Sequence, residues 1–585
     1  MTTRVVSLPT GTSFWKVNRA RVRSRHGRVT RLHSKRPFCL AAGRGVDSPA
    51  GGRPSHTAHA MPAGSTPRAV ATDVSDWDTR PAPADSVEQG EVEEGSFQWT
   101  KHWYPIHALD HLDPTRPHHA MLLGRDLALW RDGSGKWQCF EDFCPHRLAP
   151  LSEGRVEADG SLLCAYHGWR FEGSGKCTAL PQASKPVSEW KPSQVPCAVS
   201  YPTKELAGVV FVWPESGPRA AEEAAATAVR GFPEMLDDEL QATGKSTRSS
   251  WAVRDLPYGW DFFMENALDP AHVPVSHHNF VGNRYQDPTF FNLDTVRPLT
   301  PAEGVAHRTD RPFMQKTGMG TTVLDFQPPC FVRIAAREEE GGPESNICLY
   351  ATPIKPGYTR AIVCQTIVNG DVKGGKKPAN SVFFQNALPK WINHMFGALF
   401  VNQDSVFLHH QEKIVEHRLR AKNVKTVDGY DMPTPSDKAV IAFRTWYERM
   451  SGGGVPWAPG SPPMPPAERD PEKLYNLWDS HVRHCSICKA ALAKTKLWQK
   501  AVAVASVLCL FAGIATYSAS AAAAVAAGSV AIPSNIASLP LLWHTPPTSS
   551  LWAVVAGALL AVVAWQLKRL ERAFHVLTFS HADNH

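Results

Sequence analysis

The spacing of hydrophobic and polar positions divides the chain into regions of different character. Between residues 97 and 215, short apolar runs alternate with Gly- and Asp-containing turns, as in "MLLGRDLALWRDGSGKWQCFED". Runs joined by a turn such as "RDGSGKW" are typical of β-hairpins and predict a small all-β domain. Residues 216–450 mix helix-like and strand-like periodicity. The predicted fold class is therefore α+β, with an all-β domain first and an α+β domain after it.

Two long uncharged apolar runs near the C-terminus predict a pair of transmembrane helices. They cover residues 501–532 and 551–567, and a bilayer core requires about 20 apolar residues per helix. Basic residues precede the first run and follow the second, so both basic flanks lie on one side of the predicted hairpin. We expect a membrane anchor with the soluble domains on the basic side. The alternative is a pair of Ala-rich buried core helices.

The remaining segments have the composition of targeting and linker sequences. Residues 1–50 contain no Asp or Glu before Asp47 and many Lys and Arg, which predicts an organelle transit peptide; the alternative is a basic arm that binds nucleic acid. Residues 51–96, rich in Pro, Gly, Ala, Ser and acidic residues, predict a disordered linker. A Gly/Pro linker is predicted at 451–471, followed by a Cys-x2-Cys segment at 472–500. Because much of the net charge of +7 lies in the transit-peptide region, it does not predict a nucleic-acid partner.

Two mixed Cys-His pairs predict the first metal site. In "CPHRLAPLSEGRVEADGSLLCAYHGW", residues 144–169, the pairs are Cys144 with His146 and Cys164 with His167. Zinc fingers tend to pair Cys with Cys and His with His, whereas a Rieske [2Fe-2S] cluster holds one iron by two thiolates and the other by two imidazoles. We expect each pair at the tip of a β-hairpin, with the four side chains as cluster ligands. A zinc site is the alternative.

A second group of donors predicts a mononuclear iron site. The stretch "WDFFMENALDPAHVPVSHHNF", residues 260–280, contains His272 and His277, with Asn266 and Asp269 shortly before them. Non-haem Fe(II) oxygenases hold iron with two His and one carboxylate and leave positions open for O2. His272 and His277 are the predicted iron ligands, and the carboxylate has to come from elsewhere in the chain.

Both motifs resemble those of the Rieske non-haem iron oxygenases. The seventeen-residue gap between the Cys-His pairs, the sequence "YHGW" and the Asn-x2-Asp-x2-His-x4-His spacing carry the resemblance. It implies that "FVNQDSVFLHHQEK", residues 400–413, is similar to the helix that delivers the third ligand. On that basis Asp404 is the predicted iron ligand, and His409, His410 and Glu412 are competing donors.

The resemblance also implies roles for the two polar residues that precede the iron histidines. Asn266 and Asp269 are the predicted catalytic residues. Asp269 is expected to hydrogen-bond both an iron histidine and a Rieske histidine of a neighbouring subunit rather than to bind metal. Electrons would then pass between subunits, and the expected oligomer is a homotrimer.

Together with the transit peptide and the membrane hairpin, these motifs resemble the plastid branch of the family. That branch includes pheophorbide a oxygenase and Rieske components of the inner-envelope translocon. The resemblance implies a helix-grip-like catalytic domain, ferredoxin as electron donor, and O2 and a chlorophyll-derived tetrapyrrole as substrates. It places the protein in a chloroplast membrane, the inner envelope or the thylakoid, with its soluble domains facing the stroma. The alternatives are a hydroxylase of another tetrapyrrole, such as protochlorophyllide or a breakdown product, and a redox-sensing component of the protein-import machinery.

One further pair of cysteines stands just before the first apolar run. Cys485 and Cys488 form a Cys-x2-Cys motif, and the resemblance to the plastid branch implies a redox-regulatory disulfide that thioredoxin reduces. Half of a zinc site completed by His481 and His484 is one alternative. Two unrelated thiols are the other.

Overall fold

The structure is a computed structural model that describes residues 97–191, 194–311, 320–338, 340–369, 388–529 and 545–581. The predicted transit peptide and disordered linker, residues 1–96, lie outside the described residues. So do residues 530–532, the end of the first predicted membrane run.

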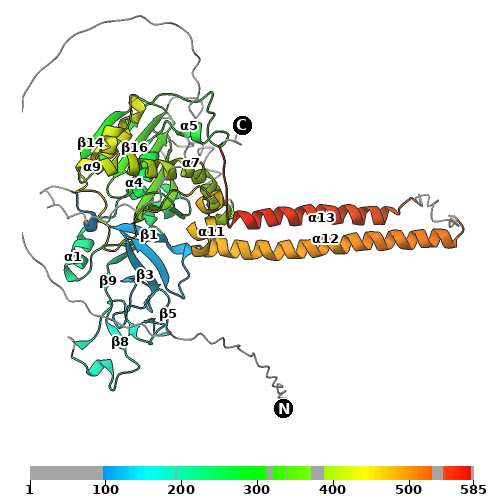
Figure 1. Cartoon of the computed structure of the whole chain (residues 1–585), viewed down its shortest axis with the longest axis horizontal. Coiled ribbons are helices and arrows are strands. Elements are labelled where there is room, and N and C mark those ends of the chain that lie inside the picture. Colours follow the sequence, from blue (N-terminus) through cyan, green and yellow to red (C-terminus); the bar gives the residue numbers. More distant parts are fainter. Residues whose placement is uncertain are drawn as a thin grey trace, which may run out of the picture. The chain divides into compact units, whose positions relative to one another are not determined.

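The first region, which begins at residue 97, folds into three antiparallel sheets, in agreement with its short alternating runs (Figure 1). The first sheet has the order β1 (Tyr104–Ala108), β11 (Val209–Val212), β10 (Thr203–Leu206). The second has the order β2 (His118–Leu122), β3 (Arg125–Arg131), β4 (Trp137–Glu141), β9 (Ser200–Tyr201). The third has the order β5 (Arg155–Val156), β6 (Leu162–Leu163), β7 (Arg170–Phe171), β8 (Cys177–Ala179). The described part of this region also contains the 3-10 turns η1 (Trp99–Lys101), η2 (Leu109–His111) and η3 (Val187–Glu189).

The predicted turn "RDGSGKW" joins β3 to β4 as an antiparallel hairpin. The Asp132 carboxylate accepts hydrogen bonds from the backbone N–H groups of Ser134 and Lys136, at 2.8 and 3.0 Å. Gly135 has φ +82°, a conformation that side chains with a Cβ rarely adopt. The local chemistry of this turn therefore fixes the hairpin that the sequence predicts.

The second region is built on a single eight-stranded antiparallel sheet. Its order is β12 (Ser246–Arg248), β19 (Tyr358–Val368), β18 (Glu344–Lys355), β17 (Phe331–Arg337), β16 (Thr321–Gln327), β15 (Gly304–Thr309), β14 (Asp294–Thr300), and β13 (Ala252–Leu256) also pairs with β19. The described helices of this region and its 3-10 turns are α1 (Pro218–Ala226), α2 (Pro233–Leu236), α3 (Asp238–Ala242), α4 (Trp260–Leu268), α5 (Val273–Ser276), α7 (Lys390–Arg418), η5 (Arg420–Lys422), α8 (Thr426–Gly429), η6 (Pro435–Asp437) and α9 (Lys438–Arg449).

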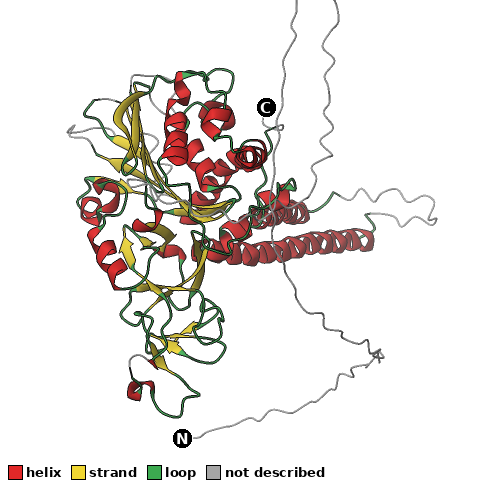
Figure 2. Ribbon diagram, turned by 60° about the vertical axis from the view of Figure 1, so that its left-hand side comes forward, coloured by secondary structure: helices red, strands yellow, loops and turns green. Residues whose placement is uncertain are grey.

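The helices that carry the candidate site gather on one face of this sheet (Figure 2). Phe443 and Trp446 of α9 are fully buried and pack on Phe326 of β16, and the buried Trp260 of α4 packs on both of them. An antiparallel sheet with helices packed on one of its faces is typical of the α+β class. The α+β prediction is confirmed.

The predicted Gly/Pro linker, 451–471, contains no helix or strand before α10 (Pro471–Leu474). It nevertheless packs along both regions. The Ser451 carbonyl accepts a hydrogen bond from the Trp99 indole at 2.7 Å, the Ala458 N–H donates to the Leu123 carbonyl at 2.9 Å, and the Glu468 N–H donates to His409 Nε2 at 2.7 Å. The segment is a strap held by its backbone rather than a free connection.

The two apolar runs lie in the long helices α12 (Ser486–Ala526) and α13 (Thr548–Ala573), which pack side by side (Figure 1). Both are long and apolar enough to cross a membrane by length and composition. A Cβ added at Gly557 would lie 2.7 Å from Leu510 Cγ, and the Gly557 carbonyl accepts a hydrogen bond from Ser506 at 2.7 Å. Small residues at the contact let the two helices approach closely, as in membrane helix pairs.

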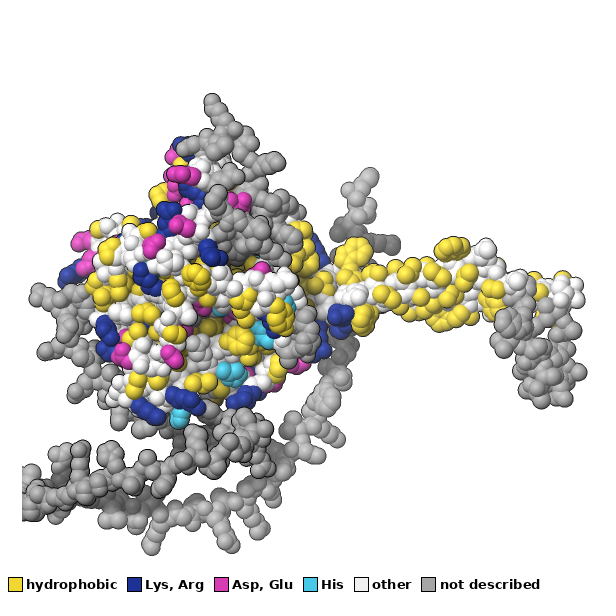
Figure 3. All heavy atoms as spheres, turned by 90° about the horizontal axis from the view of Figure 1, so that it is seen from above, with side chains coloured by type: hydrophobic (Ala, Val, Ile, Leu, Met, Phe, Trp, Pro, Cys, Tyr) yellow, Lys and Arg dark blue, Asp and Glu magenta, His cyan; other side chains and the backbone are white. Residues whose placement is uncertain are grey.

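The surface of this helical hairpin is apolar along most of its length (Figure 3). Lys and Arg side chains gather where it leaves the rest of the protein, and they comprise Lys494, Lys496, Lys500, Lys568, Arg569 and Arg572. Helix α12 starts well before the apolar run. Its first turns pack, together with α11 (Leu477–Ser480) and η7 (Val482–His484), on the second region, from here called the catalytic region because it carries the predicted iron site. These turns form the root of the hairpin.

Beyond α13 the chain returns to the catalytic region. The His575 carbonyl accepts hydrogen bonds from the N–H groups of Leu477 and Trp478. His581 Nε2 lies 2.6 Å from the Gln403 carbonyl oxygen, and its ring stacks on Phe407 at 4.4 Å between centroids. Residues 574–581, the C-terminal return segment, are therefore part of the catalytic region although they follow the hairpin.

Candidate metal centres

Two loops of the first region bring the mixed Cys-His pairs together. Cys164 and His167 lie in the β6–β7 hairpin, as predicted, whereas Cys144 and His146 lie in a loop that joins β4 to β5 in a different sheet. The expectation of two hairpins is therefore wrong for the first pair. The imidazole rings of His146 and His167 are 4.5 Å apart between centroids, and the His146 ring stacks on Trp169 at 4.3 Å.

The two loops repeat the same backbone pattern. In each, the cysteine N–H donates to a carbonyl five residues later, Ala149 or Trp169, at 2.8 Å. The residue four positions after each cysteine, Leu148 or Gly168, has a positive φ of 58° or 72°. The loops thus present two equivalent tips, each with one thiol and one imidazole.

Thiols and imidazoles occupy separate ends of this site. The Cys144 and Cys164 side chains are 2% and 1% exposed, and burial together with the neighbouring Cys164 raises the pKa of Cys144 to about 12. A bound metal is what deprotonates such thiols. Two thiols at one end and two imidazoles at the other fit the donor set of a two-iron Rieske cluster.

The second donor group lies in the catalytic region. His272 and His277 flank the short helix α5, and Asp404 comes from α7, 127 residues or more along the chain. Their donor atoms all lie within 4.8 Å of one another. Asp404 Oδ2 is 3.2 Å from His277 Nε2 and 3.9 Å from His272 Nε2. Two imidazoles and one carboxylate at one point form the donor set of a non-haem iron oxygenase.

The surroundings of His277 direct one nitrogen at this point. Its Nδ1 donates to the Gln403 side-chain oxygen at 2.6 Å, so Nε2 carries the lone pair. His277 is 0% exposed, and its Nε2 is a buried atom without a hydrogen-bond partner among the described residues. A buried acceptor of this kind is costly unless something binds it. The site fits a metal ion for this reason.

Asp404 is held as a carboxylate. Burial raises its pKa, but the neighbouring imidazoles of His277 and His272 and the Ser276 hydroxyl outweigh burial and hold the pKa below its ordinary value. Its Oδ1 accepts a hydrogen bond from the Ser276 hydroxyl. The remaining oxygen, Oδ2, faces the two imidazoles.

Asp269 and Asn266 both lie beside the His272 imidazole. Asp269 Oδ2 is 3.5 Å from His272 Nδ1, and the Asn266 amide nitrogen is 3.3 Å from His272 Nε2. Burial alone would lower the pKa of His272, but Asp269 and the Asp404 charge outweigh it and raise the pKa. Asp269 thus contacts the imidazole and is not part of the three-donor group.

The competing donors on α7 point elsewhere. His409 uses both ring nitrogens, Nδ1 to the Pro257 carbonyl at 2.6 Å and Nε2 to the Glu468 N–H at 2.7 Å. Glu412 pairs with Lys413 at 2.8 Å. Neither of them, nor His410, belongs to the donor group of His272 and His277.

A cavity of about 500 Å³ opens beside the three donors and is lined by His272 and Asp404. This volume lies within the range of small-molecule sites. Apolar walls come from Val275, Phe407, Leu408, Met432 and Val440. Arg284 also lines the cavity, and its Nε and Nη2 atoms are buried without a hydrogen-bond partner among the described residues.

Helix α4, which ends just before Asp269, is fixed by a buried ion network. Arg444 of α9 is fully buried and pairs with Asp261 and Glu265 of α4. Burial raises the pKa of Asp261, but Arg420 and Arg444 outweigh it and hold the pKa below its ordinary value. Removing one member of such a network leaves a buried charge unpaired, so the position of Asn266 and Asp269 depends on it.

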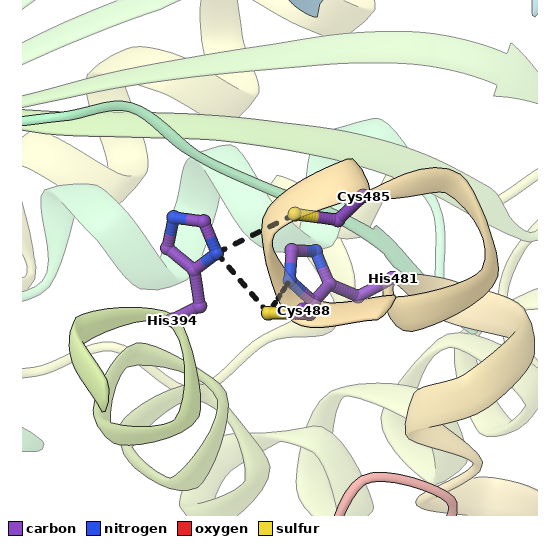
Figure 4. Close-up of side chains that lie close together, drawn as sticks. All are labelled: His394, His481, Cys485 and Cys488. Atoms are coloured by element: carbon purple, nitrogen blue, oxygen red, sulfur yellow. Dashed lines mark hydrogen bonds between the residues drawn. The ribbon is translucent and has the colours of Figure 1, made fainter. Parts of the chain in front are cut away.

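The Cys-x2-Cys pair has unexpected neighbours. Cys485 and Cys488 are free and fully buried, and they face His481 and His394 (Figure 4). His484, the second histidine of the predicted zinc alternative, instead accepts a hydrogen bond from Arg483 at 2.7 Å. Sequence spacing could not find His394, because it lies on α7, far from the cysteines along the chain.

The sequence also did not predict three further residues of the site, Gln403, Ser276 and Arg284. Gln403 directly precedes Asp404 in "NQD", so its proximity to the iron histidines could have been inferred. Ser276 and Arg284 stand next to the histidine motif, but nothing in the pattern singles them out.

Comparison with known proteins decides the family. The Rieske [2Fe-2S] domain family matches residues 102–201, and the pheophorbide a oxygenase family matches residues 326–421. The chain is 33% identical over 450 residues to chloroplastic pheophorbide a oxygenase of Oryza sativa subsp. japonica, covering 74% of this chain and 81% of that protein. The chain belongs to the pheophorbide a oxygenase family of Rieske oxygenases.

Two other relatives have different names. The chain is 29% identical to flavonoid 8-hydroxylase 2 of Ocimum basilicum, covering 68% of this chain and 75% of that protein. It is 30% identical to protochlorophyllide-dependent translocon component 52 of Arabidopsis thaliana, covering 68% and 74%. All three relatives are described as chloroplastic.

This Rieske oxygenase is an oxidoreductase that uses O2, and its cofactors are a Rieske [2Fe-2S] cluster and a mononuclear iron. The predicted family, enzyme class and cofactors are confirmed. In Rieske oxygenases the [2Fe-2S] cluster transfers electrons and the mononuclear iron uses O2. The two donor groups of this chain lie in two different regions, which agrees with that arrangement.

Proposed function

We propose that this Rieske oxygenase inserts oxygen from O2 into a chlorophyll-derived tetrapyrrole, with pheophorbide a as the first candidate and ferredoxin as the electron donor. The observation that carries the proposal is the three-donor group beside a cavity, in a chain 33% identical to a pheophorbide a oxygenase. The proposed role lies in chlorophyll catabolism.

The proposed cluster ligands are Cys144, His146, Cys164 and His167, and the proposed iron ligands are His272, His277 and Asp404. When bound, the cluster supplies electrons one at a time and the iron activates O2. Gln403 orients His277 by accepting a hydrogen bond from its Nδ1–H, and the Ser276 hydroxyl donates a hydrogen bond to the Asp404 carboxylate. These contacts fix the donors before substrate arrives.

Arg284 gives the cavity a preference for an anionic group. Its Nε and Nη2 atoms, which have no hydrogen-bond partner among the described residues, belong to a side chain that lines the cavity. A buried guanidinium forms its strongest hydrogen bonds with a carboxylate. A chlorophyll pigment that has lost its phytol chain carries a free propionate, and a macrocycle with one carboxylate matches an apolar cavity with one Arg. The apolar walls formed by Leu408, Met432 and Val440 exclude water from the bound ring.

Asp269 is the proposed link between the two metal centres. It lies 3.5 Å from His272 Nδ1, and its side chain is 30% exposed, so a neighbouring subunit's Rieske histidine has access to it. This supports the proposed homotrimer. Asp269→Asn is expected to retain both metals and slow the reoxidation of the reduced cluster about tenfold, which stopped-flow absorbance would measure. Unchanged reoxidation with full metal content would contradict the proposed route.

The proposed location is a chloroplast membrane, the inner envelope or the thylakoid, with the soluble domains in the stroma. Both basic flanks of the hairpin lie at its root, on the side of the soluble domains, as expected of a membrane face that retains positive charge. Import into isolated chloroplasts followed by fractionation and protease treatment tests this. The soluble domains should be protected by an intact envelope.

The function is tested with the purified full chain in detergent. The protein is incubated without O2 with reduced ferredoxin and a panel containing pheophorbide a, protochlorophyllide and a flavone, and 18O2 is then added. Mass spectrometry should show 18O in the pheophorbide a product. Labelling of protochlorophyllide alone would favour the alternative tetrapyrrole hydroxylase, and labelling of the flavone alone would overturn the proposal.

A redox-sensing role in protein import is a second candidate, because one relative is named a translocon component. Such a role needs the cluster but not the iron donors, and all three iron donors converge here. Chloroplasts that contain only the Asp404→Ala protein separate the two functions. Normal import with failed pigment oxidation would support the catalytic role.

A further inference from the structure

The four side chains around the Cys-x2-Cys pair converge from two separate parts of the chain. His394 comes from the first turns of α7, whereas His481 and Cys485 flank η7 and Cys488 lies in the first turn of α12. Their donor atoms all lie within 4.8 Å of one another (Figure 4). These four residues form a cluster, here called the root cluster, that plays no part in the proposed oxygenase chemistry.

Three nitrogen–sulfur distances among the donors are close to the edge length of a zinc tetrahedron. His394 Nδ1 lies 3.4 Å from Cys488 Sγ and 3.7 Å from Cys485 Sγ, and His481 Nε2 lies 3.2 Å from Cys488 Sγ. Zinc bonds of about 2.0–2.1 Å to nitrogen and 2.3 Å to sulfur give a tetrahedral N–S edge of about 3.5 Å. Donors this close leave room for one ion and not for a two-iron cluster with its sulfides.

The imidazoles are turned so that their lone pairs face the thiols. His481 Nδ1 lies 2.6 Å from the Val253 carbonyl oxygen, which can only accept a hydrogen bond. Nδ1 therefore carries the proton and Nε2 is the free donor atom. A metal-binding histidine typically gives its other N–H to a backbone carbonyl in this way. His394 directs Nδ1 at both sulfurs, and its Nε2 has no partner among the described residues.

The root cluster is sealed from solvent. The exposed fractions are 4% for His394, 5% for His481 and 0% for both cysteines. Apolar side chains surround it, among them Leu477, Leu492 and Phe574. A closed four-donor site without an open position is typical of structural rather than catalytic zinc.

We propose that His394, His481, Cys485 and Cys488 hold a structural Zn²⁺ that fastens α7 to the root of the membrane hairpin. On binding, each thiol releases its proton to solvent, so two thiolates and two neutral imidazoles balance the 2+ charge and leave a neutral buried site. No electron is transferred. Asp404 follows His394 by ten residues, about 15 Å along α7, so the ion would steady the helix that presents the iron carboxylate.

The zinc site and the thioredoxin-reducible disulfide predicted for Cys485 and Cys488 are mutually exclusive uses of the same thiols. Bound zinc occupies both sulfurs, and a disulfide leaves neither as a thiolate ligand. Full burial of both sulfurs also denies access to a protein reductant. The two readings therefore predict opposite results in the same measurements.

Metal analysis of the full chain, purified in detergent under zinc-replete and anaerobic conditions, provides the first measurement. About one zinc per chain is expected in addition to the iron. Cys485→Ser, Cys488→Ser and His394→Ala should each lose most of it. His484→Gln, from the same segment, and His410→Gln, from the same helix, are matched controls that should keep it. Zinc that is absent from the wild type, or unchanged in all three ligand variants, would overturn the proposal.

A second measurement uses only the wild-type protein, so it remains informative even if the ligand variants do not fold. Protein produced with Co²⁺ in place of zinc should show the intense visible and thiolate charge-transfer absorption of tetrahedral Co²⁺, and the two thiols should resist alkylation until a strong chelator is added. Absence of these bands would overturn the proposal. So would a Cys485–Cys488 disulfide in the anaerobically purified wild type, detected by mass spectrometry. These readouts do not involve the oxygenase substrate, so a failed pigment assay leaves them intact.

Discussion

Helix α7 contributes to two donor groups that have opposite relations to solvent. Near its start, His394 belongs to the sealed root cluster, and ten residues later Asp404 meets two histidines beside a cavity of about 500 Å³. The side chain of His272 in the iron group is 20% exposed, whereas no residue of the root cluster exceeds 5%. An open donor group accommodates substrate and O2, and a closed one serves only to hold segments together.

The difference also lies in the number and type of donors. The iron group has three donors, two nitrogens and one oxygen, which leaves positions for other ligands. The root cluster has four, two of them sulfur, which completes a tetrahedron. Helix α7 therefore contributes a histidine to a closed four-donor group and a carboxylate to an open three-donor group.

The largest expected effect comes from removing the carboxylate. Asp404→Ala should lose mononuclear iron and lower product formation by more than about 100-fold, because two imidazoles alone hold the ion weakly. The Rieske electron paramagnetic resonance signal and the zinc content should stay. Glu416→Gln, an exposed acid on the same helix, is the control. Normal turnover by the Asp404 variant would show that the third ligand lies elsewhere.

A smaller effect is expected from the residue that orients His277. Gln403→Ala removes the oxygen that accepts a hydrogen bond from His277 Nδ1–H. The neutral imidazole can then adopt the tautomer in which Nε2 is protonated and cannot bind a metal. The iron affinity should fall by about 10- to 100-fold, measured by iron titration of the apoprotein, and added iron should restore part of the activity. Gln403→Glu keeps the acceptor and should retain most of the affinity. Equal loss in both variants would indicate a packing role instead.

The smallest effect concerns the cavity. Arg284→Ala should raise KM for pheophorbide a by about tenfold, the equivalent of about 1.4 kcal/mol for a lost charged hydrogen bond, with little change in kcat. The methyl ester of the same pigment should bind the wild type and the variant alike. An equal rise in KM for acid and ester would mean that Arg284 does not contact the carboxylate. The metal content of both centres should be unaffected.

The sequence predicted the parts of these sites that are local. The pairs Cys144/His146 and Cys164/His167, and the run from Asn266 to His277, could be recognised because each loop or short helix holds its donors at a fixed spacing. The RDGSGKW hairpin, residues 131–137, and the apolar helices were predicted for the same reason. Periodicity and turn chemistry are properties of neighbouring residues.

What escaped prediction depends on long-range packing. His394 reaches the cysteines only because α7 crosses the root of the hairpin, and no pattern around it marks it as a donor. Gln403 and Arg284 act through contacts that form only in the folded chain. The packed strap at 451–471 is similar, since its Gly and Pro content predicts irregular backbone but not the carbonyls and indole that hold it.

The C-terminal return segment limits how the protein can be shortened. His581 lines the cavity and contacts the Gln403 carbonyl, so a chain cut before the hairpin to obtain a water-soluble enzyme would also lose part of the active-site wall. Because α12 and α13 lie side by side, a short connection across their apolar portions could replace the membrane-spanning part and keep residues 574–581 in place. Detergent-free crystallisation of the enzyme would have to start from such an internal deletion rather than from a truncation.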